Sequence, residues 1–358
     1  MQWIHTRFDQ SGYKVLMWGL GVFLTLNTQA QIGGRRNFEF LQVPGNARLA
    51  GLGRVNVSLH QGDPNVLWQN PALIDSASSR KFGFNYTPYF ADIKNTHLSY
   101  VHQVPKLGTF GAGLNYMAYG SFEETDASGQ VLGTFAANDY AFTVSYAHQI
   151  KYFRMGINLK FIGSQIATYN ASALAVDIGG AFVHPKYDWT IGLVFKNIGL
   201  VLSDYNDFTQ SRLPFEVQLG TSFKPKYMPF RFSLTLQQMQ QFDITYLDPL
   251  QDVTFDANGN TVPREKNFGD NLLRHFVIGG ELMPDKAFSI RLGYNHLINR
   301  ELREEGASRL NGFSYGFRIR IKGQEFAFSR ASYHAAGGRN FLSLYLDFNR
   351  VLKKRVVN

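Results

Sequence analysis

Alternation of apolar and polar positions is the dominant pattern of the chain from Lys81 onward. Successive side chains of a β-strand point to opposite faces, so each alternating segment predicts a strand with one apolar face and one polar, small or basic face. The clearest example runs from Phe313 to Lys322, where Phe, Tyr, Phe, Ile and Ile alternate with Ser, Gly, Arg, Arg and Lys. Similar segments begin at Phe153 and Trp189.

Fourteen such segments can be delimited, and most are as long as a tilted transmembrane strand, which needs about 9–11 residues. Strands of soluble proteins are commonly only about 5–6 residues long, so this length favours a membrane barrel over a soluble β-sandwich. The expected strands cover residues 81–90, 95–104, 109–119, 138–149, 152–163, 172–183, 188–198, 213–224, 229–240, 274–283, 287–297, 312–322, 325–333 and 339–348.

The connections between these segments are short at every second position. The short ones cover residues 105–108, 150–151, 184–187, 225–228, 284–286 and 323–324, and the longest of the others cover residues 120–137, 199–212, 241–273 and 298–311. Outer-membrane barrels have short periplasmic turns and long extracellular loops. The pattern therefore predicts an all-β, 14-stranded transmembrane antiparallel β-barrel over residues 81–348, in the outer membrane and with both ends of the barrel in the periplasm.

The first thirty residues have the features of an export signal. Arg7 and Lys14 precede the apolar stretch 15–26, and residues 28–30 (Thr-Gln-Ala) place small side chains at a cleavage site. A membrane anchor is the alternative, but the apolar stretch is shorter than the roughly 20 residues that a helical span needs. We expect a cleaved signal peptide over residues 1–30, which makes the aperiodic residues 31–80 the start of the mature chain.

Composition excludes several classes of protein. The mean hydropathy of −0.19 is too low for a protein with several membrane-spanning helices, whereas aromatic residues at 15% fit the interfacial girdles of a barrel. The absence of cysteine excludes disulfides and thiolate metal sites. The net charge of +9 is spread along the chain up to a basic periplasmic tail at residues 349–358, so no nucleic-acid interface is indicated.

No catalytic or metal-binding pattern stands out. His97 and His102 lie five apart on one expected strand, hence on opposite faces, and no other histidine pair has metal-ligand spacing. Residues 312–316 spell Gly-Phe-Ser-Tyr-Gly, the letters of a nucleophile elbow, but that motif needs a turn from a strand into a helix. Since the alternation runs straight through it, Ser314 is expected on the inner face of a strand. We expect no enzyme activity, no metal and no cofactor.

Several short motifs occur in order over most of residues 38–240. They are residues 40–53, 65–73 with Asn70-Pro71-Ala72 at their centre, 119–122, 133–139, 172–179, 196–199 and 213–215. On these motifs the chain resembles the PorV/PorQ group of Bacteroidetes type IX secretion proteins, and its PorQ-like members most closely; that group in turn resembles the FadL-like 14-stranded barrels. One departure is the end of the last strand, near Phe348, which is followed by the basic tail instead of ending the chain.

The resemblance implies a non-enzymatic barrel in a surface attachment complex, which couples secreted cargo to anionic lipopolysaccharide. The implied partners are a PorU-like sortase, a PorV-like shuttle barrel and a lipopolysaccharide-binding PorZ-like protein, besides outer-membrane lipid. By analogy with FadL-like barrels, residues 31–80 would form a plug inside the lumen, with Asn70, Pro71 and Ala72 as its motif. A FadL-like uptake channel for hydrophobic small molecules is the alternative function.

Two sets of side chains are candidates for binding. Loop aromatics are suited to partner contact, since aromatics are enriched at interface hot spots, although girdle or loop packing is an equal alternative. They are Phe122, Phe135, Tyr205, Phe208, Tyr246 and Phe255. Basic residues on the non-lipid face would either pair with Asp177, Asp347 and plug carbonyls or form an anion-binding lumen. They are Arg154, Lys160, Lys196, Arg231, Arg291, Arg318, Arg320 and Lys322.

Overall fold

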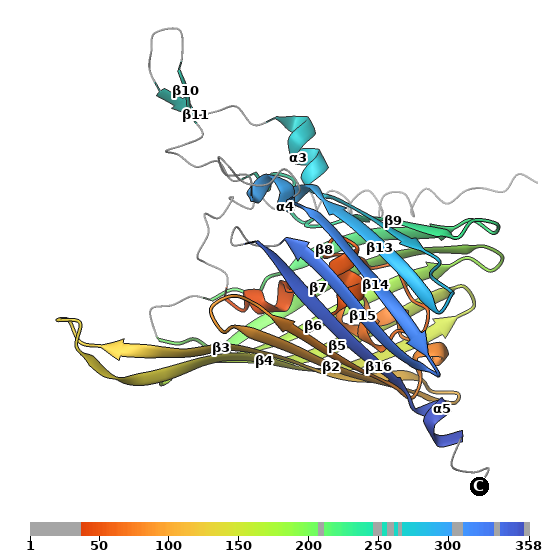
Figure 1. The fold of residues 1–358 in the computed structure, drawn as a ribbon, viewed down its shortest axis with the longest axis horizontal. Helices are drawn as coiled ribbons and strands as arrows, with labels where there is room; N and C mark the ends of the chain where they lie inside the picture. Colours follow the sequence, from red (N-terminus) through yellow and green to blue (C-terminus); the bar gives the residue numbers. More distant parts are fainter. Residues whose placement is uncertain are drawn as a thin grey trace, which may run out of the picture. The chain divides into compact units, whose positions relative to one another are not determined.

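The computed structural model describes residues 37–206, 211–245, 253–255, 261–263, 267–302, 311–332 and 337–353. These residues form a closed antiparallel barrel of 14 strands (Figure 1), which confirms the fold class expected from the alternation. The expected signal peptide lies outside the described residues.

The barrel is built almost entirely from neighbours in sequence. Its strands are β1 (Lys81–Pro88), β2 (Lys94–Val104), β3 (Gly108–Thr125), β4 (Val131–Ile150), β5 (Phe153–Ile166), β6 (Tyr169–Val183), β7 (Asp188–Ser203), β8 (Glu216–Lys224), β9 (Phe230–Leu236), β12 (Phe276–Leu282), β13 (Phe288–Asn295), β14 (Phe313–Ile321), β15 (Gln324–Ser332) and β16 (Gly338–Asp347). Pairing of β16 with β1 closes the ring, and β12 pairs with β9. The short strands β10 (Val253–Phe255) and β11 (Thr261–Pro263) form a separate hairpin within the β9–β12 loop.

The alternation along each strand separates two environments. In β5, Asn158 is completely buried, whereas its neighbours Ile157 and Leu159 are 45% and 56% exposed. Large apolar side chains thus cover the outer face, where lipid replaces water, and polar or small ones point inward. We call the end with short turns the turn end and the opposite one the loop end.

Several strand boundaries differ from the sequence-based expectation: β7 continues to Ser203 instead of ending at residue 198, and β9 ends at Leu236 instead of residue 240. Residues 120–137 were expected as a loop, but β3 and β4 continue to Thr125 and from Val131, with Phe122 opposite Phe135. The hairpin can extend because its two arms satisfy each other's hydrogen bonds beyond the barrel rim. At the chain's end, β16 stops at Asp347, and Phe348 begins α5 (Phe348–Lys353) while donating its N–H to the Arg80 carbonyl at 3.0 Å.

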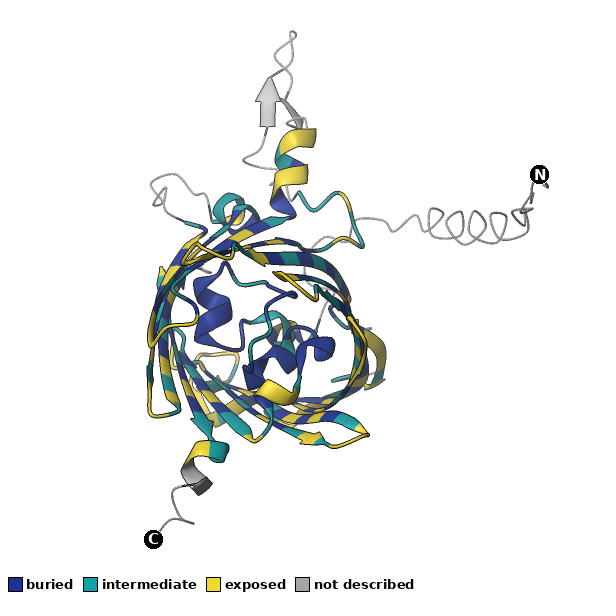
Figure 2. Cartoon of the chain, turned by 90° about the vertical axis from the view of Figure 1, so that its right-hand side faces the viewer, coloured by how far each residue is buried: buried dark blue, intermediate teal, exposed yellow. Residues whose placement is uncertain are grey.

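Residues 37–80, here called the inner segment, lie inside the barrel (Figure 2). They form five short helices with side-chain caps where Asn or Asp precedes a turn, such as Asn46, which accepts a hydrogen bond from the Leu49 N–H at 2.8 Å. The helices are η1 (Glu39–Gln42), α2 (Ala47–Gly51), η2 (Pro64–Trp68), η3 (Pro71–Leu73) and η4 (Ser76–Ser78).

The helix α2 packs against the last strands of the barrel. The Ala47 N–H donates to the Ser343 hydroxyl of β16 at 2.8 Å, and the Ser329 hydroxyl of β15 donates to the Ala47 carbonyl at 2.5 Å. Ala47 and Ala50 share an apolar cluster with inward-facing Phe341, among other residues of β15 and β16. The backbone of the inner segment therefore contacts the barrel wall directly.

Two further helices lie at the loop end, α3 (Phe268–Arg274) and α4 (His296–Glu301), and Asp270 joins them by accepting from His296 at 3.2 Å and pairing with Arg300 at 2.8 Å. None of the helices in the described parts of the chain is long and apolar enough to span a membrane.

The lipid-facing role of the outer surface can be tested with Leu159→Arg. An arginine facing lipid near the bilayer midplane destabilises a barrel by about 2–4 kcal/mol, so urea unfolding in lipid vesicles should shift by that amount. The matched control is Leu132→Arg, because Leu132 is similarly exposed at 63% but lies in the part of β4 beyond the barrel rim. Equal stability of the two variants would contradict the placement of the membrane.

Candidate docking surface and the filled lumen

A single carboxylate, Glu281 on β12, is the centre of a buried cluster of charges. Antiparallel register places Arg291 of β13 opposite it on one side and Arg231 of β9 on the other. Glu281 accepts hydrogen bonds from Arg291 Nε at 3.1 Å and from Arg231 Nη1 at 3.5 Å. Arg48 of α2 completes the cluster, with Nε and Nη2 at 2.9 and 2.7 Å from the two carboxylate oxygens.

The remaining donors of Arg48 also have partners within the inner segment. Its Nη1 donates to the His60 carbonyl at 3.0 Å and its Nη2 to the Gln61 side chain at 3.1 Å. Burial opposes the charge of Arg48, but the Glu281 and Asp63 carboxylates together outweigh burial and raise the pKa of Arg48 above its usual range. Breaking such a buried pair commonly costs about 3–5 kcal/mol, so Arg48 fastens α2 to the wall.

A second buried cluster connects the wall to η2. Lys160 on β5 pairs with Asp177 on β6 at 2.7 Å and donates to the Asn197 side chain at 2.9 Å. Asn158 donates to both Asp177 and the Leu67 carbonyl, at 2.8 and 2.9 Å. The sequence-predicted lumen cation Lys160 is therefore neutralised inside the wall.

The Asn70-Pro71-Ala72 motif forms a close contact between the inner segment and the wall. The Asn70 side chain caps η3 by accepting from the Ala72 N–H at 3.0 Å, and it donates to the Gly180 carbonyl of β6 at 3.2 Å. Wall residues at this contact have no side chain: a Cβ at Gly156 would overlap the Pro71–Ala72 peptide, and a Cβ at Gly179 would overlap the Asn70 side chain. Glycine thus lets the two backbones approach.

The other sequence-predicted basic residues divide between the lumen and the turn end. Arg154 pairs with Asp75 of the inner segment at 3.1 Å, and Arg320 pairs with Glu325 at 2.7 Å. Arg318 is buried and donates through Nη2 to the Pro284 and Lys286 carbonyls. Lys322, in contrast, lies exposed in the β14–β15 turn with a φ of 50° and does not face the lumen.

The loop end carries a hairpin that extends past the barrel (Figure 1). Pairing of β3 with β2 ends at Ala118, and pairing of β4 with β5 ends at Ala137. We call residues 121–136 the hairpin extension; each arm has about five residues, hence roughly 17 Å at ~3.4 Å per residue. Phe122 and Phe135 stack across it with ring centroids 5.4 Å apart, and Phe122 is 43% exposed.

The remaining predicted partner-binding residues do not gather around this pair. The Tyr205 ring packs on the cluster of Phe38 and Phe40, and its hydroxyl lies 2.6 Å from the Ser164 hydroxyl, so it is a loop-packing residue. Phe255 ends β10, and its side chain lies outside the described residues together with Phe208 and Tyr246.

The serine of the Gly-Phe-Ser-Tyr-Gly motif and the nearby His296 have ordinary structural roles. Ser314 is buried in the barrel wall as the second residue of β14, and the strand continues to Ile321 with no turn into a helix. His296 bonds with Asp270 in the α3–α4 contact. Over the described ranges, no group of three or more His, Asp or Glu side chains is arranged to hold a metal ion.

A closed 14-stranded antiparallel barrel with an apolar outer face and a polar interior defines an outer-membrane β-barrel protein. The model of the type IX secretion system protein PorV matches residues 28–231, more than half of the chain. The chain therefore belongs to the PorV family and is an outer-membrane barrel of the type IX secretion system. Among curated protein sequences, none gives a significant match.

Solved structures of transport barrels share low sequence identity with the chain. The toluene transporter TbuX of Ralstonia pickettii is 10% identical, with a TM-score of 0.49 over 85% of this chain and 97% of that one. The deltaS2 mutant of the monoaromatic hydrocarbon channel TodX is 12% identical, with a TM-score of 0.48 over 85% and 97%. A Pseudomonas aeruginosa FadL homologue is 12% identical, with a TM-score of 0.45 over 85% and 98%. Similarity of this degree supports no inference about ligand or transport.

Close packing at Gly179 predicts a strong effect of Gly179→Leu on assembly. The added side chain would displace Asn70, so the folded, heat-modifiable band on gels should be reduced or lost. Gly180→Leu is the matched control, because nothing lies within 4 Å of a Cβ there, and it should assemble normally. Similar yields of the two variants would show that the inner segment does not pack at this contact.

Loss of the Arg48–Glu281 contact should loosen the inner segment. We expect Arg48→Met to lower the free energy of unfolding by about 3–5 kcal/mol and to raise single-channel conductance in planar bilayers. Arg54→Met is the control, since Arg54 is partly exposed and its Nε lies 3.4 Å from the Gln42 carbonyl. An unchanged free energy of unfolding in Arg48→Met would contradict the role of Arg48 in holding α2 against the wall.

Proposed function

We propose that this barrel is a non-enzymatic, PorQ-like member of the type IX secretion attachment complex. It docks an extracellular partner so that secreted cargo becomes attached to surface lipopolysaccharide. The observation that carries the proposal is the hairpin extension, a two-stranded arm with exposed Phe122 beside Phe135, on a barrel whose interior is occupied by residues 37–80. Such a barrel is better suited to holding a partner than to conducting solute.

The plug role of the inner segment is supported by burial. Asn65, Leu67 and Asn70 are completely inaccessible to solvent, although they lie inside what would otherwise be a lumen. Asn65 is held from three sides, by Asn85, Ser99 and the Asp63 carboxylate. A segment tied to the wall by so many buried hydrogen bonds does not leave without a cost of several kcal/mol. We propose that the mature chain, starting after the signal peptide, carries residues 31–80 as a resident plug.

We propose docking at the loop end because the long loops between strands lie there, held by the barrel. Loops fixed on such a scaffold are common binding surfaces, and exposed aromatic residues are common interface anchors. The arms of the extension have exposed apolar side chains near the tip, Val131 and Leu132, at 54% and 63%. These side chains lie beyond the last residues that pair with the neighbouring strands β2 and β5. They are therefore outside the lipid-facing part of the barrel. We assign Phe122 and Phe135 as the central contact for the partner.

The partners proposed for this surface follow from the family. A PorZ-like extracellular protein would contact the loop end, with a PorU-like sortase and a PorV-like barrel in the same assembly. The short turns would then face the periplasm, with the basic tail at residues 349–358.

An uptake channel for hydrophobic small molecules is the second candidate, and one observation favours it. Pairing of β7 with β8 ends at Lys196 opposite Glu216, which leaves the last part of β7 unpaired on that side among the described residues. A cavity of about 380 Å³ lies there, and Ile198, Leu200 and Leu213 are among the residues that line it. An apolar opening in the wall is the kind of site that such a channel requires.

Replacement of residues 121–136 by an Asn-Gly turn tests the docking function. Barrel assembly should stay intact because the replaced residues lie beyond the rim, whereas co-purification of the extracellular partner and attachment of cargo at the cell surface should be lost. Shortening of residues 241–273 in a separate variant tests the second long loop in the same assays.

The point variant Phe122→Ser with Phe135→Ser should reduce partner recovery, with Glu123→Gln as a control on the same arm. Docking would be refuted if the hairpin variant kept every partner and attached cargo normally. Loss of growth on an apolar nutrient in that case would establish the channel.

A further inference from the structure

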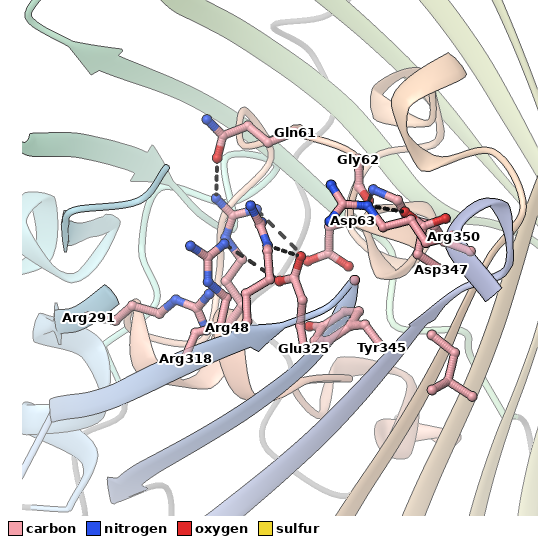
Figure 3. A pocket seen from close by; sticks show the side chains of 14 residues that line it. Arg48, Gln61, Gly62, Asp63, Arg291, Arg318, Glu325, Tyr345, Asp347 and Arg350 are labelled. Atoms are coloured by element: carbon pink, nitrogen blue, oxygen red, sulfur yellow. Dashed lines mark hydrogen bonds and ion pairs between the residues drawn. The ribbon is translucent and has the colours of Figure 1, made fainter. Parts of the chain in front are cut away.

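A strongly basic cavity opens at the turn end of the barrel (Figure 3). Its volume is about 160 Å³, far more than the roughly 10–15 Å³ that one water molecule needs. Arg320 and Arg350 form its outer rim, with side chains 33% and 63% exposed, so the cavity is open to solvent. Gln61, Gly62 and Asp63 of the inner segment form part of its wall.

Positive charge exceeds negative charge around this cavity. Six cationic side chains line it, namely Arg48, Lys81, Arg291, Arg318, Arg320 and Arg350. Three carboxylates line it as well, Asp63, Glu325 and Asp347, and a fourth, Glu281, contacts Arg48 and Arg291 from behind. Six cations against four carboxylates leave an excess of two positive charges.

Two of the buried guanidinium groups have unused donors. Arg291 is 2% exposed and Arg318 is 7% exposed. Neither Arg291 Nη1 nor Arg318 Nε has a hydrogen-bond partner among the residues that the structure describes. An unsatisfied buried donor on a charged group is costly, commonly more than about 1–3 kcal/mol. Both side chains line the cavity, and the unused donors leave each guanidinium group able to take a further acceptor.

From this geometry we infer that the cavity is a binding site for a phosphoryl group. A phosphate monoester carries a charge of about −1.5 to −2 at neutral pH and has three acceptor oxygens. The charge matches the excess of two positive charges, and guanidinium forks are the preferred donors to phosphate. Figure 3 shows Arg48, Arg291 and Arg318 gathered on one side of the cavity, with Glu325 and Tyr345 beside them. The site lies at the opposite end of the barrel from the hairpin extension and does not depend on the proposed docking.

Calorimetric titration of the purified full-length barrel with inorganic phosphate, in detergent and against sodium chloride of equal ionic strength, tests the site. Phosphate should bind to the native chain, and Arg318→Gln should weaken binding by at least tenfold. Arg318 also holds the Pro284 and Lys286 carbonyls, so its variant must first show the native heat-modifiable mobility.

A second variant keeps the test valid if Arg318→Gln fails to fold. Arg350→Gln, at the exposed rim, should assemble normally and bind phosphate severalfold more weakly. Lys226→Gln is the matched control, because Lys226 is an exposed cation of the β8–β9 turn outside the cavity, and its phosphate affinity should equal that of the native chain.

The source of the phosphoryl group is distinguished by a titration with a short-chain phosphatidic acid in the same detergent. Binding at least tenfold tighter than inorganic phosphate would assign a lipid headgroup, and equal affinity would assign a soluble phosphate. The inference would be overturned if neither inorganic phosphate nor phosphatidic acid bound. It would also be overturned if the native chain and both arginine variants bound phosphate with equal affinity.

Discussion

Every backbone N–H and C=O within the hydrocarbon core of a membrane must find its partner inside the protein. The chain meets this constraint by pairing each strand with two neighbours until β16 meets β1. Ring size then creates a second problem. Eight-stranded barrels are filled by their own side chains, whereas barrels of 16–18 strands leave a water-filled channel. Fourteen strands enclose more space than their inward side chains occupy, and the inner segment fills it.

Filling the lumen with polypeptide brings polar backbone into the barrel, and this explains the composition of the inner face. Many strand positions that contact the inner segment are Gly, Ser, Asn or Thr, which leave room or supply hydrogen bonds. Charged residues on the inner face form pairs such as Lys160–Asp177, because an unpaired charge is costly where water is scarce. Around the cavity at the turn end, which opens to solvent, positive charge exceeds negative charge.

The strands could be predicted from the sequence because their apolar face is set by lipid and repeats every second residue. The residues at which the strands end beyond the barrel rim could not be predicted in this way. The hairpin extension has no lipid beside it, so Glu123, Glu124 and Thr125 break the alternation although they remain in the ladder. The same reasoning explains α5, which replaces the strand at Phe348 once the rim is passed.

Sequence reasoning placed Arg231 and Arg291 on the non-lipid face but missed their partner Glu281 and the fourth member of the cluster, Arg48. Glu281 and Arg291 flank a short turn, so the sequence allows their pairing to be predicted. An acidic residue on the inward face opposite an arginine indicates an ion pair. The position of Arg48 could not be predicted, because 233 residues separate it from Glu281 and its stretch has no periodicity. Contacts of this kind depend on where the inner segment lies after the barrel has formed.

The contact of α2 with β15 and β16 has a consequence for the order of assembly. The first part of the inner segment bonds to the last two strands through Ala47, with Ser329 and Ser343 on either side. Glycine-lined contacts leave little clearance around η3 and α2. Because the partners of Ala47 lie on the last two strands, α2 can make its native contacts only once β15 and β16 are present. Packing of the inner segment is thus coupled to completion of the ring.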